Sequence, residues 1–161
     1  MIFDHQTDMG YLYNVIENHY MKLKIGITSG CFDLLHPMHV KYLQRCRAAC
    51  DVLIVGIDTD ELMYKLKGKY PMFPAAERAF MVNSLECVDH VFTMNTLETL
   101  EYVCNISKSL HKKVRLFKGQ STYYNEPVLQ VEGVKTVFIR DIEVPDSTSK
   151  LLECIQAKSN G

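Results

Sequence analysis

The chain has 161 residues and a formal net charge of −1, with 18 Lys plus Arg against 19 Asp plus Glu. This length fits one domain with a hydrophobic core, and the balanced charge argues against a nucleic-acid partner. No apolar run approaches the roughly 20 residues that span a bilayer, and the first ten residues are too polar for a signal peptide, so we expect a cytoplasmic protein without a membrane partner.

Strand-like and helix-like patterns alternate along the chain. Residues 1–20 form an N-terminal extension with a short helix around residues 9–18, which docks on the domain or, in a homodimer, on a second subunit. Alternating apolar residues predict a strand over residues 23–28, and helical spacing follows over residues 40–50. The almost continuous apolar run 52–57 predicts a central strand covered on both faces.

The second half continues this alternation. Residues 65–71 have the composition of a polar, basic loop, and Pro74 opens a helix with Glu77 in its first turn. The remaining expected elements are a strand at 88–92, a helix at 97–110, strands at 114–118 and 136–139, and a last helix after Asp146 or Ser147. We therefore predict an α/β fold, a single Rossmann-like domain with a parallel sheet flanked by helices, over residues 21–157, followed by a tail at 158–161.

The strongest functional pattern is the segment Ser29-Gly30-Cys31-Phe32-Asp33-Leu34-Leu35-His36-Pro37-Met38-His39. A strand runs into a glycine turn and then into a helix whose first turn carries His36 and His39. Imidazoles three residues apart share one helix face, and the amides at a helix N-terminus attract phosphate. Ligands of such sheets bind beyond the carboxyl ends of the strands, where the strand order reverses. The pattern predicts a triphosphate site in which both histidines donate to charge developing on the α- and β-phosphates.

The two histidines admit other interpretations. One could cap the helix while the other lies in the core, although a pair after a strand and a glycine turn favours ligand binding. With Cys31 they could bind zinc, but no second pair with ligand spacing exists elsewhere, so we expect no protein metal site. The six cysteines lack paired short spacings and indicate buried free thiols in a reducing compartment. Neither G-x-G-x-x-G nor the Walker motif follows the first strand, so a glycine-rich loop does not hold the nucleotide.

The histidine segment resembles the G-x-F-D-x-x-H-x-G-H signature of the cytidylyltransferase-like nucleotidyltransferases, with Met38 where that family has glycine. The resemblance extends over residues 22–156. It implies four catalytic residues, His36, His39, Lys67 and Arg78. It implies nucleotide binding by Gly30, Cys31, Phe32, Lys118, Gly119, Ser147 and Thr148. It implies acceptor binding by Asp33, Asp60 and Met38, and Asp33 would also hold the turn.

This resemblance implies transfer of a nucleoside monophosphate from an NTP to a small phosphorylated acceptor, such as a sugar or polyol phosphate, with release of pyrophosphate. Mg²⁺ would accompany the NTP and be bound mainly through its phosphates. Residues 65–68 and 74–78 look most like heptose-phosphate adenylyltransferases and archaeal FMN adenylyltransferases, which favours ATP. The histidine segment is equally similar to glycerol-phosphate, choline-phosphate and ethanolamine-phosphate cytidylyltransferases, so CTP is the alternative.

Met38 keeps two further alternatives open. Glycine would let a ligand approach the helix backbone closely, whereas methionine adds a flexible side chain facing the same pocket. The chain could be a non-catalytic nucleotide-binding relative of the family. It could also be an interaction subunit in which residues 1–20 carry the binding surface.

Overall fold

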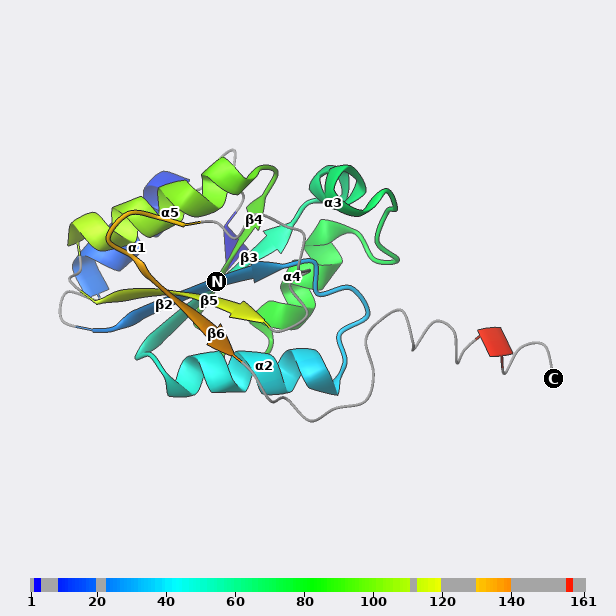
Figure 1. The fold of residues 1–161 in the computed structure, drawn as a ribbon, viewed down its shortest axis with the longest axis horizontal. Coiled ribbons are helices and arrows are strands. Elements are labelled where there is room, and N and C mark those ends of the chain that lie inside the picture. Colours follow the sequence, from blue (N-terminus) through cyan, green and yellow to red (C-terminus); the bar gives the residue numbers. More distant parts are fainter. Residues whose placement is uncertain are drawn as a thin grey trace.

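The computed structural model describes residues 2–3, 9–19, 23–110, 113–119, 130–139 and 156–157. These residues form a six-stranded sheet with helices on both faces (Figure 1). The strands are β1 (Ile2–Phe3), β2 (Ile25–Gly30), β3 (Val52–Asp58), β4 (His90–Met94), β5 (Val114–Gly119) and β6 (Lys135–Ile139). The helices are α1 (Met9–His19), α2 (Pro37–Ala48), α3 (Asp60–Lys67), α4 (Ala75–Asn83) and α5 (Leu97–Leu110). None of these helices combines the length and the apolar character that a bilayer-spanning helix needs.

The sheet is parallel throughout its described pairings. Its strand order is β1-β4-β3-β2-β5-β6, and β2 pairs with β3 on one side and with β5 on the other. The chain moves to one side of β2 first and to the other side later, so the order reverses beside β2. The region beyond the carboxyl ends of β2 and β5 is therefore the expected ligand position in such a sheet. The predicted α/β class with a parallel Rossmann-like sheet is confirmed.

Each face of the sheet packs a separate hydrophobic cluster. One cluster joins α1 and α5 to side chains such as Ile25 and Ile54, and the other joins α2 and α4 to side chains such as Leu53 and Val55. All seven residues of β3 are buried, which confirms the central strand covered on both faces. The result is a three-layer arrangement of helix, sheet and helix, which Figure 1 shows with α1 and α5 opposite α2.

The described N-terminal residues belong to this sheet and core. Ile2 pairs with Val91 at the sheet edge, and α1 buries Leu12, Val15 and Ile16 against the cluster that contains α5. The expected short helix is confirmed as α1, and it docks on the domain's own core. The proposed division of the chain at residue 20 stays a prediction.

One expected strand boundary and part of one expected loop were wrong. The strand expected at 88–92 begins at His90, because Val88 N donates to Leu85 O in a turn and Asp89 accepts a hydrogen bond from Leu53 N. Residues 65–67, expected in a loop, form the last turn of α3. Thr59 caps this helix and Gly68, with a φ of 69°, ends it in the left-handed conformation.

Other expected elements agree with the structure. Helix α5 has the predicted bounds, and β5 and β6 each differ from theirs by one residue. Pro74 precedes α4 as expected, at its cap position, and Glu77 lies in the first turn. The last expected helix, with Asp146 or Ser147 as its cap, lies outside the described residues, apart from a short helical piece at 156–157.

The described cysteines are free thiols, as expected. Cys31, Cys46, Cys50 and Cys104 are buried, and Cys87 is half-buried. Burial raises the pKa of Cys46 and Cys104 to about 12 and that of Cys50 to about 11, so these thiols stay protonated at neutral pH. Cys154 lies outside the described residues.

The close approach at Gly26 gives a stability prediction. A Cβ there would lie 2.5 Å from Cys50 Sγ and 2.6 Å from the Phe117 ring, both in the core. We expect Gly26→Ala to lower the free energy of unfolding by about 1–3 kcal/mol in urea titrations, because the core would be overpacked. Gly10→Ala in α1 is the matched control, since nothing lies within 4 Å of its new Cβ. It should be neutral or stabilise by up to about 1 kcal/mol. Equal losses in both variants would contradict the packing argument.

Candidate active site

The loop between β2 and α2 is tightly turned. Phe32 has a φ of 51° and Leu34 a φ of 46°, both in the left-handed region, which costs non-glycine residues about 1–3 kcal/mol each. The buried Asp33 carboxylate accepts a hydrogen bond from Leu34 N at 3.1 Å, and the Phe32 ring packs into the cluster with α2 and α4. These contacts fix the backbone that leads to His36.

His36 and His39 lie against each other at the start of α2. His36 occupies the cap position with an extended backbone, and Pro37 begins the helix. The two imidazole centroids are 3.9 Å apart with an interplanar angle of 33°, which confirms the expected placement on one face. The His39 ring also meets the Phe32 ring edge-on, at 5.4 Å and 64°. Met38, half-buried, lies between the two histidines in sequence.

The electrostatic surroundings keep His39 neutral at pH 7. Burial lowers its pKa to about 4, and the positive charges of His36 and Lys67 act in the same direction. Within the described part of the chain, His39 Nδ1 is buried and has no hydrogen-bond partner. This nitrogen is a polar atom that a bound ligand or water could satisfy.

Side-chain contacts hold α2 against β2 and β5, the two strands at the reversal of strand order. Thr28 Oγ1 in β2 lies 2.7 Å from the hydroxyl of Tyr42 in α2 and donates to Phe117 O in β5 at 3.2 Å. The backbone of Gly119, which ends β5 beside Lys118, passes the Tyr42 ring so closely that a Cβ there would lie 3.5 Å from it. The ends of β2 and β5 and the start of α2 are thereby held in one arrangement.

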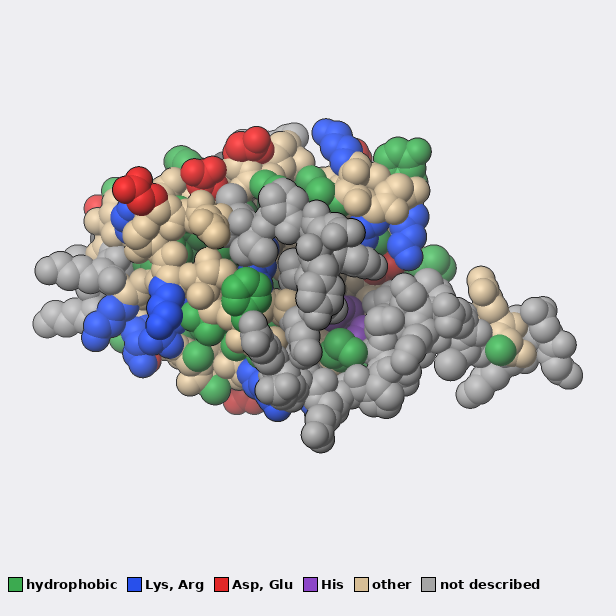
Figure 2. All heavy atoms as spheres, viewed as in Figure 1, with side chains coloured by type: hydrophobic (Ala, Val, Ile, Leu, Met, Phe, Trp, Pro, Cys, Tyr) green, Lys and Arg blue, Asp and Glu red, His purple; other side chains and the backbone are tan. Residues whose placement is uncertain are grey.

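Helix α3 brings a lysine to the same edge of the sheet. Thr59 caps the helix by accepting a hydrogen bond from Leu62 N at 3.3 Å, and Asp60 and Glu61 complement the dipole in the first turn. Lys67 lies exposed in the last turn. Its positive charge adds to the effect of burial that lowers the pKa of His39, and it opposes the effect of burial that raises the pKa of Cys31. Figure 2 shows imidazole surface on the viewed face and basic side chains over α3.

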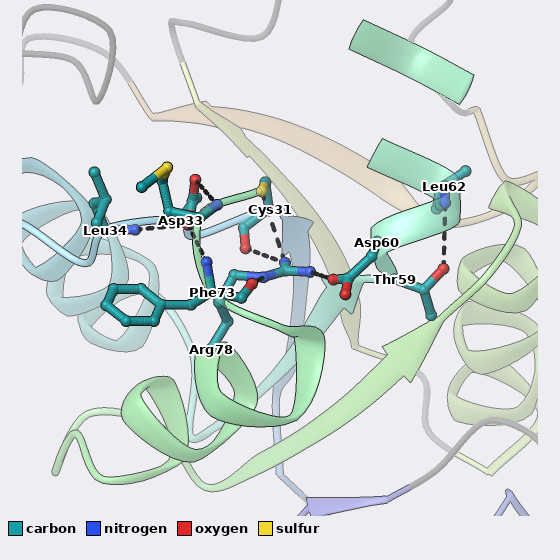
Figure 3. Close-up of polar contacts among 9 residues, drawn as sticks. Cys31, Asp33, Leu34, Thr59, Asp60, Leu62, Phe73 and Arg78 are labelled. Carbon is teal, nitrogen blue, oxygen red and sulfur yellow. Dashed lines mark hydrogen bonds and ion pairs between the residues drawn. The ribbon is translucent and has the colours of Figure 1, made fainter. Parts of the chain in front are cut away.

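Arg78 is buried among protein groups. Its side chain is 0% exposed, and Nη2 pairs with Asp60 Oδ1 at 2.6 Å (Figure 3). Nη1 donates to Cys31 O at 2.6 Å and Nε donates to Phe73 O at 2.8 Å. Burial raises the pKa of the Cys31 thiol, and the Arg78 charge opposes that shift. The resemblance implies that Arg78 binds phosphate, but the structure directs the guanidinium toward these three partners.

Most of the predicted site residues lie at this carboxyl edge. Strand β2 supplies Gly30 and β5 supplies Lys118 and Gly119. The β2–α2 loop, α2, α3 and α4 supply Cys31, Phe32, Asp33, His36, Met38, His39, Asp60, Lys67 and Arg78. Ser147 and Thr148 lie outside the described residues. The catalytic and binding roles of all these residues stay predictions.

Two backbone amides contribute to this site and could not be predicted from the sequence. The amides of Met72 and Phe73 donate to the Asp33 carboxylate at 2.9 and 3.2 Å. These residues contribute backbone atoms, so their side-chain types carry no signal. Phe73 precedes Pro74, which favours an extended backbone and is the single local hint of a fixed turn.

Comparison with known proteins agrees with this geometry. The sequence matches the cytidylyltransferase-like family over residues 27–147. It is 35% identical over 150 residues to the bifunctional protein HldE of Helicobacter pylori strain HPAG1, covering 92% of this chain and 31% of that protein. It is 39% identical over 134 residues to the bifunctional protein HldE of Helicobacter hepaticus, covering 83% of this chain and 27% of that protein. The chain thus spans about a third or less of the length of these relatives.

A solved structure supports the fold. The crystal structure of a lipopolysaccharide core biosynthesis protein from Thermoplasma volcanium superimposes with a TM-score of 0.62 at 23% sequence identity. The match covers 75% of this chain and 99% of that chain. At this identity the likeness concerns the arrangement of the sheet and its helices.

The low pKa of His39 gives a prediction about stability and pH. The unfolded chain binds a proton at His39 below about 6.5, whereas the folded protein resists it until about pH 4. We expect this residue to reduce the free energy of unfolding as the pH falls from 6.5 to 4, by up to about 3 kcal/mol. In the His39→Gln variant, the loss of stability between pH 7 and pH 4.5 in urea titrations should be smaller than in the wild type. An equal loss would contradict the buried, neutral state of His39.

Proposed function

Because the chain belongs to the cytidylyltransferase-like family, we propose that it is a nucleotidyltransferase that transfers a nucleoside monophosphate from an NTP to a small phosphorylated acceptor. The observation that carries this proposal is the His36–His39 pair at the start of α2, with ring centroids 3.9 Å apart. The pair lies at the start of α2, which follows β2, the strand beside which the strand order reverses.

The proposed reaction needs no covalent enzyme intermediate. An oxygen of the acceptor phosphate attacks the α-phosphorus of the NTP and forms a new P–O bond, and the bond to the β-phosphate breaks so that pyrophosphate leaves with the electron pair. His36 and His39 would donate hydrogen bonds to the α- and β-phosphate oxygens as charge develops there. Lys67 would place a positive charge beside them, and the start of α2 would hold the phosphates near its amides.

Mg²⁺ enters this scheme as part of the MgNTP substrate. In the described residues, no group of three or more His, Cys, Asp or Glu side chains is arranged to hold a metal ion. A magnesium ion bound mainly by phosphates and water requires no such protein cage. The residues of this edge would therefore bind the phosphates, and the ion would arrive with them.

We propose ATP as the preferred nucleotide and a sugar phosphate as the acceptor. The support is the similarity of residues 65–68 and 74–78 to heptose-phosphate adenylyltransferases, and it agrees with the match to the two HldE proteins. A CTP-dependent enzyme of the glycerol-phosphate, choline-phosphate or ethanolamine-phosphate type is the alternative. The homodimer and the cytoplasmic location stay predictions.

A pyrophosphate-release assay tests the function. The chain would be incubated with Mg²⁺, each NTP and a panel of sugar phosphates, polyol phosphates and FMN, and we expect release with ATP and a sugar phosphate. His36→Ala and His39→Ala should each lower the rate by about 10²-fold, the scale of losing one preorganised donor. Circular dichroism would check that both variants fold. Wild-type turnover in either folded variant would contradict the catalytic assignment.

A second candidate function follows from Met38, which stands half-buried in the first turn of α2. If the chain is a non-catalytic nucleotide-binding protein, ATP or CTP should raise its melting temperature, and no pyrophosphate should be released. If the chain is an enzyme, we expect Met38→Gly to lower kcat/KM toward the true acceptor, because the methionine side chain would pack on that acceptor. The substitution should cost at most about 1 kcal/mol of stability. Unchanged activity and affinity in Met38→Gly would mean that residue 38 does not face the ligand.

A further inference from the structure

Arg78 and Asp33 together hold three segments of the chain at the carboxyl edge of the sheet. Arg78 binds the carbonyls of Cys31 and Phe73 and the carboxylate of Asp60. Asp33 accepts from the amides of Met72 and Phe73 at 2.9 and 3.2 Å. Figure 3 shows these groups converging from the β2–α2 loop, the start of α3 and the loop before α4.

The guanidinium of Arg78 binds other groups of the protein through all of its nitrogens. Each of its three guanidinium nitrogens has a partner within 2.8 Å, and the side chain is 0% exposed. A bidentate contact to phosphate would need two donors on one edge of the guanidinium to face the ligand. The Nη2 edge faces Asp60 and the Nε edge faces Phe73.

The anchored segment is the one that carries Lys67. It begins at Asp60, which Arg78 holds, and ends at Met72 and Phe73, which Asp33 and Arg78 hold. Lys67 lies between these anchors at the end of α3, close enough to the histidine site that its charge lowers the pKa of His39. A lysine side chain is long and flexible, so the place of its backbone decides where its charge can reach.

We propose that Arg78 is a positioning residue that fixes the segment 60–73, and with it Lys67, against the loop that carries His36 and His39. The proposal rests on the proposed nucleotidyl transfer, for which Lys67 would face the phosphates. It differs from a direct phosphate contact, because Arg78 acts here through the backbone and through Asp60. Lysine at position 78 would keep the charge but could not reach all three partners with one ammonium.

Hydrogen exchange without nucleotide tests the anchoring itself. In Arg78→Lys the amides of Met72 and Phe73 should exchange at least about tenfold faster than in the wild type, because local opening becomes easier. Amides of β3 should be unchanged if the variant is folded. Asp60→Asn, which keeps the size of the side chain but removes its charge, should produce the same pattern if Arg78→Lys fails to fold. Unchanged protection of Met72 and Phe73 in a folded variant would overturn the proposal.

A double-mutant cycle tests the positioning role. We expect Arg78→Lys to lower kcat/KM for the NTP by about tenfold or more, since a misplacement of about 1 Å can cost 10²-fold. In the Lys67→Ala background the same substitution should cost less than about threefold, because its effect passes through Lys67. An unreduced effect in that background would overturn the positioning role and indicate direct contact with substrate.

The chain offers a matched control variant, and a failure of the proposed function can be distinguished from a failure of the anchoring. Arg47 forms an ion pair with Asp89 in which Nε lies 3.3 Å from Oδ2, and the two side chains are 36% and 31% exposed. Arg47→Lys should leave kcat/KM unchanged, because an exposed ion pair contributes little. If the wild type releases no pyrophosphate with any NTP and acceptor, the proposed function fails. The positioning role then fails with it, whereas the anchoring of Met72 and Phe73 is decided by hydrogen exchange alone.

Discussion

The buried guanidinium of Arg78 is the interaction on which the arrangement of the carboxyl edge depends. Burying a cation costs several kcal/mol unless an opposite charge and hydrogen-bond acceptors surround it. Asp60 supplies the charge, and the carbonyls of Cys31 and Phe73 supply the acceptors. These partners come from three separate segments, so none of the segments can withdraw without leaving a buried charge short of a partner. Removing one partner of a fully buried ion pair costs about 3–5 kcal/mol, and the 32% exposure of Asp60 makes the loss smaller here.

The elements that the sequence predicts best are those whose packing is visible in their apolar pattern. Helix α5 has its predicted bounds because its apolar side chains recur at helical spacing and bury Leu100, Val103 and Cys104. Strand β3 follows from a run that is apolar on both faces. Helix α3 was not among the expected elements, because its last turn is polar and exposed and its ends are marked only by the caps at Thr59 and Gly68.

The candidate site likewise contains a part that the sequence predicts and a part that it does not. The histidine pair is predictable because spacing alone places His36 and His39 on one helix face, and their rings do meet. The surroundings of Arg78 are not predictable from the sequence, because two of its partners are backbone carbonyls. In addition, the position of an arginine four residues after Pro74 does not indicate whether its side chain faces solvent or the interior. The same holds for Asp33, which binds backbone amides distant in sequence.

The distribution of positive charge near the site links the contacts of Arg78 to the proposed function. The chain carries a formal net charge of −1, so a triphosphate needs local cations. His39 is neutral at pH 7 because its pKa is about 4, and the charge of Arg78 is compensated by Asp60. The exposed Lys67 and the N-terminus of α2 therefore carry much of the attraction that the described residues offer to an anion. A flexible lysine needs a fixed backbone beneath it, and the ion pair between the buried Arg78 and the partly exposed Asp60 holds the start of α3, the helix that ends at Lys67.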